Sequence, residues 1–182
     1  MSRIGSLGFR HLKPLISEEL IAEKVQKTAA QIKKDFQGED LVIVMVLKGA
    51  ICLVADLIRQ LDVPLDLEIV QCESYGALGK SRGALTLIGV DRLRVHNRDV
   101  LIVDDIFDSG YTMATLVDTV KKLGPRSIKS CVLLYKKDVQ KATEYRPDYV
   151  MFEIDNLFVV GYGLDYKEKY RGLAGVYTLE DS

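Results

Sequence analysis

The sequence contains few of the residues that build histidine metal centres, disulfide frameworks or basic nucleic-acid surfaces. Only two of its 182 residues are histidines, which argues against a zinc site with histidine ligands. The three cysteines are odd in number and stand among apolar residues, so we expect buried, reduced thiols in a cytoplasmic protein. The net charge of −1 provides no basic field for non-specific binding to nucleic acid.

Long apolar runs are also missing. No stretch is long enough to cross a bilayer as a helix, and the N-terminus lacks a secretory signal pattern, so we expect no membrane partner. What remains is a composition of 48% hydrophobic and 28% charged residues, which is typical of a globular protein with an ordinary core.

Residues 99–112, DVLIVDDIFDSGYT, hold the densest group of chemically useful side chains. The apolar residues 100–103 predict a buried strand, which ends in the carboxylate pair Asp104 and Asp105. Residues 112–124 then have helical spacing and end in glycine. The loop between them therefore lies at the carboxyl end of a parallel strand, where open α/β sheets bind ligands.

This loop combines an anion site with carboxylates. Backbone N–H groups at the start of the helix can hold a phosphate, and Gly110 permits its close approach. The pair Asp104 and Asp105 is costly at a strand end unless water or a ligand solvates it. A ribose phosphate, which offers hydroxyls and a phosphate, matches such a site. An ordinary strand with a solvated acidic end is the alternative.

Strand and helix patterns alternate along the chain. Residues 41–47 predict a continuous buried strand that is followed by Lys48, Gly49 and a crossover helix at 51–61. Further strands are predicted at 65–73, 84–89, 127–138 and 149–154, and a further helix at 17–37. We therefore expect an α/β fold with a doubly wound, mostly parallel sheet. It forms a single domain over 1–182, with a core at about 38–160 and a small hood from about 1–37 and 161–182.

Residues 74–83, SYGALGKSRG, join two predicted strands and are rich in glycine and basic residues. The GKS at 79–81 lacks the upstream glycine and the following helix of a phosphate-binding P-loop, so we discard that motif. The glycines and the basic residues Lys80 and Arg82 suit a loop that is mobile when the site is empty and ordered over bound phosphates, which predicts a lid over the site. A disordered hairpin tip is the alternative.

The stretch VLIVDDIFDSGYT resembles the signature of type I phosphoribosyltransferases, which bind phosphoribosyl diphosphate (PRPP). VLKG at 46–49, the Ser–Tyr pair at 74–75, LLYKK at 133–137 and FEIDNLFVVGYGLDYKEKYR at 152–171 accompany it in family order. Together they resemble the purine-salvage members, the hypoxanthine-guanine phosphoribosyltransferases. That resemblance implies transfer of phosphoribose from PRPP to N9 of hypoxanthine or guanine. It also implies Mg²⁺ as the cofactor, PRPP and a 6-oxopurine as substrates, and a dimer or tetramer.

Site residues are implied by position in these motifs. Asp108 is implied as the general base near purine N7. The implied PRPP and phosphate contacts are Lys48, Gly49, Asp104, Asp105, Asp108, Ser109, Gly110, Tyr111, Thr112 and Arg171. The implied purine contacts are Ile106, Lys136, Phe158, Val159 and Asp165. The implied Mg²⁺ ligands are Asp104, Asp105 and Asp165. Lys136 is implied to donate to O6, Phe158 to stack on the purine, and the Leu47–Lys48 peptide bond to be cis. Ser74 and Tyr75 match the root of the family's catalytic lid.

Some positions depart from the usual family pattern, and some alternatives stay open. Ala50, Asp104 and Tyr111 stand where glycine, glutamate and lysine are common. In one alternative, Lys136 is a solvated lysine at a strand end, and Lys137 or backbone groups recognise the purine base instead. A xanthine-preferring enzyme is one alternative function. The other is a regulatory PRPP-binding protein that binds nucleic acid, which predicts a basic face or an added DNA-binding domain.

Overall fold

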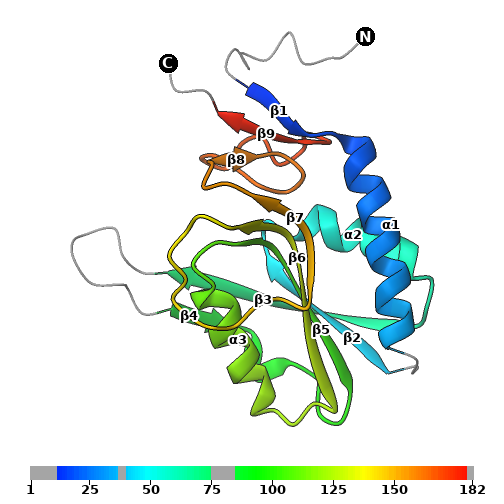
Figure 1. The fold of residues 1–182 in the computed structure, drawn as a ribbon. Helices are drawn as coiled ribbons and strands as arrows, with labels where there is room; N and C mark the ends of the chain where they lie inside the picture. The colour runs from blue at the N-terminus through cyan, green and yellow to red at the C-terminus, as the bar shows by residue number, and fades with distance from the viewer. Residues whose placement is uncertain (1–11, 37–39, 75–84, 180–182) are drawn as a thin grey trace.

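Two β-sheets organise the computed structural model, which describes residues 12–36, 40–74 and 85–179 (Figure 1). The larger sheet has the strand order β4-β3-β2-β5-β6-β7. Its strands are β2 (Leu41–Leu47), β3 (Leu65–Ser74), β4 (Leu85–Ile88), β5 (Asp99–Phe107), β6 (Ser127–Lys136) and β7 (Tyr149–Ile154). Neighbouring strands are parallel except for β3 and β4, which confirms the mostly parallel sheet.

Helices cover both faces of this sheet, so the fold is doubly wound (Figure 1). Helices α1 (Glu18–Asp35) and α2 (Ile51–Leu61) share a hydrophobic cluster with one face. Helix α3 (Tyr111–Lys121) packs its apolar stripe on the other face. The central strands are continuous apolar runs because both of their faces are buried. Among the described residues, no helix has the length and apolar character needed to cross a membrane.

The predicted N-terminal part of the hood includes helix α1. Ser17 caps α1 by accepting a hydrogen bond from the Leu20 N–H, as its N-cap position predicts. The apolar stripe of α1, which includes Ile21, Val25 and Ile32, then enters the cluster on the central sheet. Our prediction places this helix in the hood, and the helix packs in the cluster that the central sheet shares with hood residues such as Val159 and Val176. Helical spacing indicates which face is buried but not which element covers it.

The hood is a three-stranded antiparallel sheet in the order β1-β9-β8. It brings β1 (Leu12–Ile16) beside β9 (Val176–Leu179) and β8 (Val159–Val160). This small sheet lies beyond the carboxyl ends of the central strands (Figure 1). Segments from both ends of the chain therefore stand over the edge where a ligand site is expected.

The strand order places that site between β2 and β5. From β2 the chain crosses to β3 on one side and later returns to β5 on the other side. Such a reversal leaves a crevice at the carboxyl ends of the two strands. β5 is longer than the predicted 100–103, because its pairing with β6 continues to Phe107 opposite Tyr135. Asp104 and Asp105 therefore lie within the strand rather than after it.

The predicted lid lies almost wholly outside the described residues. Ser74 is the last residue of β3, whereas Tyr75 and the rest of residues 75–84 are not described. β4 begins at Leu85 and pairs antiparallel with β3, so the two strands are joined as a hairpin. The roles of Ser74 and Tyr75 in closure remain predictions.

Candidate active site

A cavity of about 340 Å³ opens at the carboxyl ends of β2 and β5. It is lined by the loop after β2, by the end of β5, by the loop that enters α3, and by the segment between β8 and β9. The predicted site residues that line it are Lys48, Gly49, Asp104, Asp105, Ile106, Asp108, Ser109, Gly110, Thr112, Asp165 and Arg171. The fold thus gathers three distant sequence segments around one space.

Glycines make the contact between the core and the hood. A Cβ atom at Gly49 would overlap the Asp105 carboxylate, so only glycine fits beside it. Gly163, which has a φ of +99°, lies against the Gly49 carbonyl so closely that a Cβ there would overlap its oxygen. The peptide bond between Leu47 and Lys48, just before this contact, is cis, as the resemblance implies. The loop after β2 is therefore confined between β5 and the hood.

Asp104 and Asp105 form an adjacent acidic pair in which Asp104 is buried and Asp105 is partly buried. Asp104 is 7% exposed, and its Oδ1 accepts the Asp105 backbone N–H at 2.9 Å. Burial and the adjacent Asp105 charge hold the pKa of Asp104 well above its usual range. Burial also raises the pKa of Asp105, and the Arg171 charge opposes that rise. Hydroxyl donors or a cation in the cavity would stabilise the charged forms of both carboxylates.

The carboxylates at this cavity suit a Mg²⁺ ion that is also coordinated by substrate phosphates and water, rather than one held by protein ligands alone. Among the described residues, no group of three His, Cys, Asp or Glu side chains is placed to hold a metal by itself. Mg²⁺ commonly keeps its waters and binds through one or two carboxylates together with substrate phosphates. Asp104 and Asp105 supply such oxygens, and Asp165 lines the same cavity. Asp165 is itself held by Arg171 Nη2 at 2.8 Å and by the Glu168 N–H.

The loop before α3 has the geometry of an anion site. Gly110 has a φ of +83°, and a Cβ there would overlap the Phe107 ring. α3 begins at the next residue, so the free N–H groups of its first turn face the loop. Ser109, Gly110 and Thr112 line the cavity, whereas Tyr111 does not and is exposed. The tyrosine at this position therefore brings no charge to the cavity.

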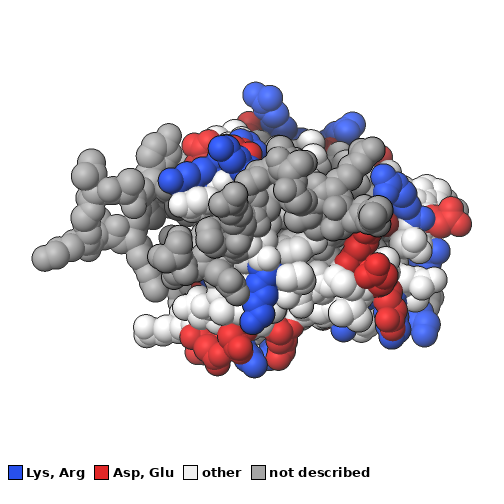
Figure 2. All heavy atoms as spheres, turned by 90° about the horizontal axis from the view of Figure 1, so that it is seen from above, with Lys and Arg blue, Asp and Glu red and all other residues white. Residues whose placement is uncertain are grey.

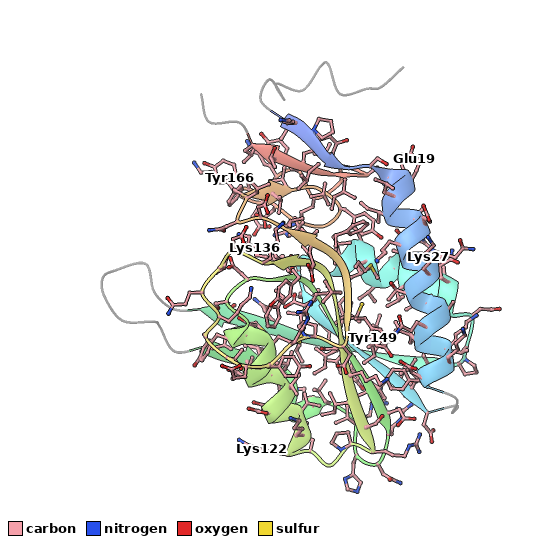
Figure 3. The ribbon with its side chains drawn as sticks, in the orientation of Figure 1. Glu19, Lys27, Lys122, Lys136, Tyr149 and Tyr166 are labelled. Carbon is pink, nitrogen blue, oxygen red and sulfur yellow. The ribbon has the colours of Figure 1, made fainter. Side chains whose placement is uncertain are left out.

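Lys136 and Asp108 meet at the edge of this loop. Lys136 is the last residue of β6, and its Nζ lies 3.2 Å from Asp108 Oδ2 and 3.2 Å from Asn156 Oδ1. The Lys136 side chain is only 12% exposed. The neighbouring Lys137 instead pairs with Asp155 at 2.9 Å in a more exposed position. Figure 3 labels Lys136 where the central sheet meets the hood.

The remaining predicted purine contacts come from the start of β8. Phe158 is 55% exposed, and its ring packs edge-to-face on Tyr166 with centroids 5.6 Å apart. Val159 is buried and pairs with Thr178 of β9. Neither residue lines the 340 Å³ cavity, in contrast to Ile106 and Asp165. The Phe158 ring therefore presents a free face to solvent.

Two functional candidates were missed in the sequence. Glu168 accepts from Lys48 Nζ at 3.2 Å and lies 3.3 Å from Arg171 Nη2, so it holds both cations of the cavity. Lys141 donates to the backbone carbonyls of Asp108 and Lys136. Glu168 lies within the family-like stretch 152–171, but its spacing from other residues gave no sign of a functional role. No local signal identified Lys141, because its partners lie up to 33 residues away.

Comparison with known proteins agrees with this geometry. The profile of the phosphoribosyl transferase domain family matches residues 15–167. A hypoxanthine-guanine phosphoribosyltransferase of Mycobacterium tuberculosis is 40% identical over 173 residues, which are 91% of this chain and 85% of that protein. A solved hypoxanthine-guanine phosphoribosyltransferase of Bacillus anthracis is 36% identical with a TM-score of 0.87, covering 94% of this chain and 100% of that one.

A solved hypoxanthine phosphoribosyltransferase of Staphylococcus aureus is similar over nearly the same extent. It has a TM-score of 0.88 and 34% identity, and the match covers 97% of this chain and 96% of that one. The match therefore includes the central sheet and the hood together. This chain belongs to the phosphoribosyl transferase family.

Proposed function

We propose that this protein transfers the 5-phosphoribosyl group of PRPP to N9 of hypoxanthine or guanine, forming IMP or GMP and diphosphate. The observation that carries this is the 3.2 Å contact between Lys136 Nζ and Asp108 Oδ2, beside the anion loop. It puts a donor for an oxo group next to a carboxylate that can take a proton. Asp108 lines the cavity that suits a ribose phosphate, and Lys136, which does not line the cavity, contacts Asp108 at its edge.

In the reaction the bond between ribose C1′ and the diphosphate oxygen breaks, and a bond between C1′ and purine N9 forms. Diphosphate leaves with the electron pair, and Asp108 accepts the proton that the purine loses at N7. The ribose passes through an oxocarbenium-like state, so charge stabilisation and exclusion of water dominate catalysis. Residues 74–83, which lie almost wholly outside the described residues, are the proposed lid, with Ser74 and Tyr75 at its root.

The phosphates and the ribose are held by groups from several elements. Lys48 and Arg171 neutralise the diphosphate, and Glu168 positions both of them. The loop Asp108 to Thr112 receives the 5′-phosphate. Asp104 and Asp105 accept hydrogen bonds from the ribose hydroxyls. Together with Asp165 they would hold Mg²⁺, which would supply positive charge to neutralise the diphosphate.

The purine is read by a lysine and an aromatic ring. Lys136 has three donors and no acceptor, so it complements O6 of hypoxanthine or guanine and not the amino group of adenine. Phe158 stacks on the ring, Val159 meets the base edge through its backbone, and Ile106 contacts the purine from β5.

Neither alternative function is favoured. The similar proteins named above are hypoxanthine-guanine or hypoxanthine phosphoribosyltransferases. In the view of Figure 2, Lys and Arg are interspersed with Asp and Glu across the described residues, and no continuous basic surface is visible there. The net charge of −1 likewise gives binding of nucleic acid no support.

We also propose a cytoplasmic homo-oligomer, either a dimer or a tetramer. Leu67 and Ile69 of β3 and Ile88 of β4 are large, exposed apolar side chains on adjacent strands. Such neighbouring side chains are typical of a protein–protein contact. Cys52, Cys72 and Cys131 are free thiols, which suits a reducing compartment. Size-exclusion chromatography with light scattering tests the oligomer, and a monomer at micromolar concentration would contradict it.

A spectrophotometric assay with PRPP and Mg²⁺ tests the activity against hypoxanthine, guanine, xanthine and adenine in turn. We expect turnover with hypoxanthine and guanine and much lower kcat/KM with adenine. Absence of turnover with every purine, or a preference for xanthine or adenine, would overturn the proposal.

A further inference from the structure

The loop after β6 packs against the loop that receives the phosphate. The Ala142 N–H donates to the Ser109 carbonyl at 2.8 Å. A Cβ atom on Gly110 would lie 2.9 Å from Thr143 Cγ2, so these two segments are in close contact. Residues 141–143 therefore support the anion loop from outside the cavity.

Lys141 joins the backbones of the two residues that form the edge of the site. Its Nζ donates to the Asp108 carbonyl at 2.7 Å and also to the Lys136 carbonyl. The ammonium lies 4.2 Å from the centroid of the Tyr135 ring and 5.3 Å from that of Phe107. These two rings are stacked with their centroids 5.2 Å apart, so the ammonium makes cation–π contacts with both members of a stacked pair.

The position of these bonds explains why a side chain is needed. Backbone pairing between β5 and β6 ends at Phe107 opposite Tyr135. Asp108 is the residue after β5 and Lys136 is the last residue of β6, so both lie one step beyond that pairing. Lys141 donates hydrogen bonds to the backbone carbonyls of both residues. It therefore connects the ends of β5 and β6 at a point where the two strands no longer pair through their backbones.

We propose that Lys141 is a positioning residue that sets the distance between the Lys136 and Asp108 side chains through their backbones. This inference rests on the proposed roles of Asp108 and Lys136 in the transfer reaction. Lys141 takes no part in the chemistry. It links recognition of the purine oxo group to the loop that holds the 5′-phosphate.

Arg146 provides a matched control because it also lies over the Tyr135 ring, with its guanidinium 5.0 Å from the centroid. Its Nη2 bonds Glu153 Oε1 at 2.7 Å on β7. Arg146→Met thus removes a cation from the same ring without changing a bond to Asp108 or Lys136. Loss of ring contact alone would affect both variants equally.

The test measures kcat and KM for hypoxanthine and for PRPP in Lys141→Met, Lys141→Arg and Arg146→Met. Misplacement by about 1 Å costs up to about 100-fold in rate, so we expect Lys141→Met to lose about 10- to 100-fold in kcat/KM for hypoxanthine. The KM for PRPP should stay near the wild-type value. Lys141→Arg should restore most of the loss, and Arg146→Met should match wild type.

A double-mutant cycle with Lys136→Ala separates positioning from a general structural effect. If Lys141 acts through Lys136 and Asp108, Lys141→Met should cost much less in the Lys136→Ala background than in wild type. Equal losses in both backgrounds, a loss confined to the KM for PRPP, or wild-type kinetics in Lys141→Met would each overturn the inference. If Lys141→Met does not fold, Lys141→Gln, which keeps neutral N–H donors, replaces it in the same cycle.

Failure of the proposed function has a different signature. An inactive wild-type enzyme, or a Lys136→Ala variant with wild-type selectivity, contradicts the assigned roles themselves. An active wild type whose selectivity depends on Lys136 but not on Lys141 contradicts only the positioning role.

Discussion

Lys136 Nζ lies 3.2 Å from Asp108 Oδ2, although 28 residues separate the two in the chain. The contact arises because β5 and β6 are parallel neighbours that end at the same edge of the sheet. It joins the two groups that we assign to proton transfer and base recognition. The first two predictions separate these roles.

Asp108→Asn should lower kcat by about 100-fold or more while the KM for PRPP changes little. The amide keeps the shape of the side chain but cannot accept the purine proton. Steady-state kinetics with hypoxanthine provide the measurement. Asp138→Asn, in the exposed loop after β6, is the control and should behave like wild type. Near-wild-type turnover in Asp108→Asn would remove this residue from the chemistry.

Lys136→Ala should lower kcat/KM for hypoxanthine by about 100-fold and leave the low value for adenine nearly unchanged. The reason is that the lysine loses a charged hydrogen bond to O6, which adenine does not form. The ratio of the two kcat/KM values is the measurement. Lys137→Ala is the matched control, because that neighbour pairs with Asp155. An unchanged ratio in Lys136→Ala would show that selectivity lies elsewhere.

Activity should require a divalent cation. The leaving diphosphate is highly charged, and the adjacent carboxylates Asp104 and Asp105 at the cavity are suited to a hard metal shared with it. Titration with EDTA should abolish turnover, and Mg²⁺ or Mn²⁺ should restore it. Full activity after exhaustive chelation would refute the metal requirement.

Gly49→Ala should reduce activity strongly, because the added methyl group overlaps the Asp105 carboxylate. Displacement of the carboxylate or of the loop after β2 should cost about 10- to 100-fold in kcat/KM. Gly172→Ala is the control, since a Cβ there meets nothing within 4 Å. Kinetics and circular dichroism of both variants distinguish a local effect from unfolding. Equal activity of the two variants would show that the contact is not limiting.

Asp99 should make stability depend on pH in the acid range. Two hydrogen bonds from Arg126 hold the pKa of Asp99 below its ordinary value of 3.8. Burial opposes this effect, and Ser127 adds a third bond. Because the folded-state pKa is lowered, the stabilisation is present above the unfolded value and is lost as pH falls through the folded-state value. Asp99→Asn should therefore be less stable than wild type at pH 7, and the difference should shrink below about pH 4.

Urea unfolding at pH 7 and pH 3 measures this difference. Asp91→Asn is the control, because Asp91 is exposed and lies 4.0 Å from its only ion-pair partner among the described residues, Arg92. A destabilisation by Asp99→Asn that is equally large at both pH values would rule out ionisation of Asp99 as its cause.

Local patterns in the sequence were sufficient for several elements. The strand at 41–47 and the helix at 51–61 have the predicted bounds, because unbroken apolar runs and helical spacing depend only on neighbouring residues. The same holds for the strand at 149–154. Long-range pairing decided β5, which extends past 103 because β6 lies beside it.

The residue types of the candidate site could likewise be identified from the sequence. The acidic pair and the glycine turn predict a ribose-phosphate site by their chemistry, whereas the role of Lys136 toward a purine oxo group is implied only by the family resemblance. The sequence also indicated that these groups stand at the carboxyl ends of predicted parallel strands. Strand ends at one edge of a sheet bring such groups together whatever the intervening loops contain.

Tertiary structure alone decided which side chains meet. Lys141, 33 residues from Asp108, bonds its carbonyl, and Glu168, 120 residues from Lys48, bonds its ammonium. It also decided that α1 covers the central sheet and that Phe158 stays exposed. Periodicity specifies that a face is buried and composition specifies what a side chain can bind. The partner in each case depends on packing between segments whose separation in the chain carries no information about their distance in space.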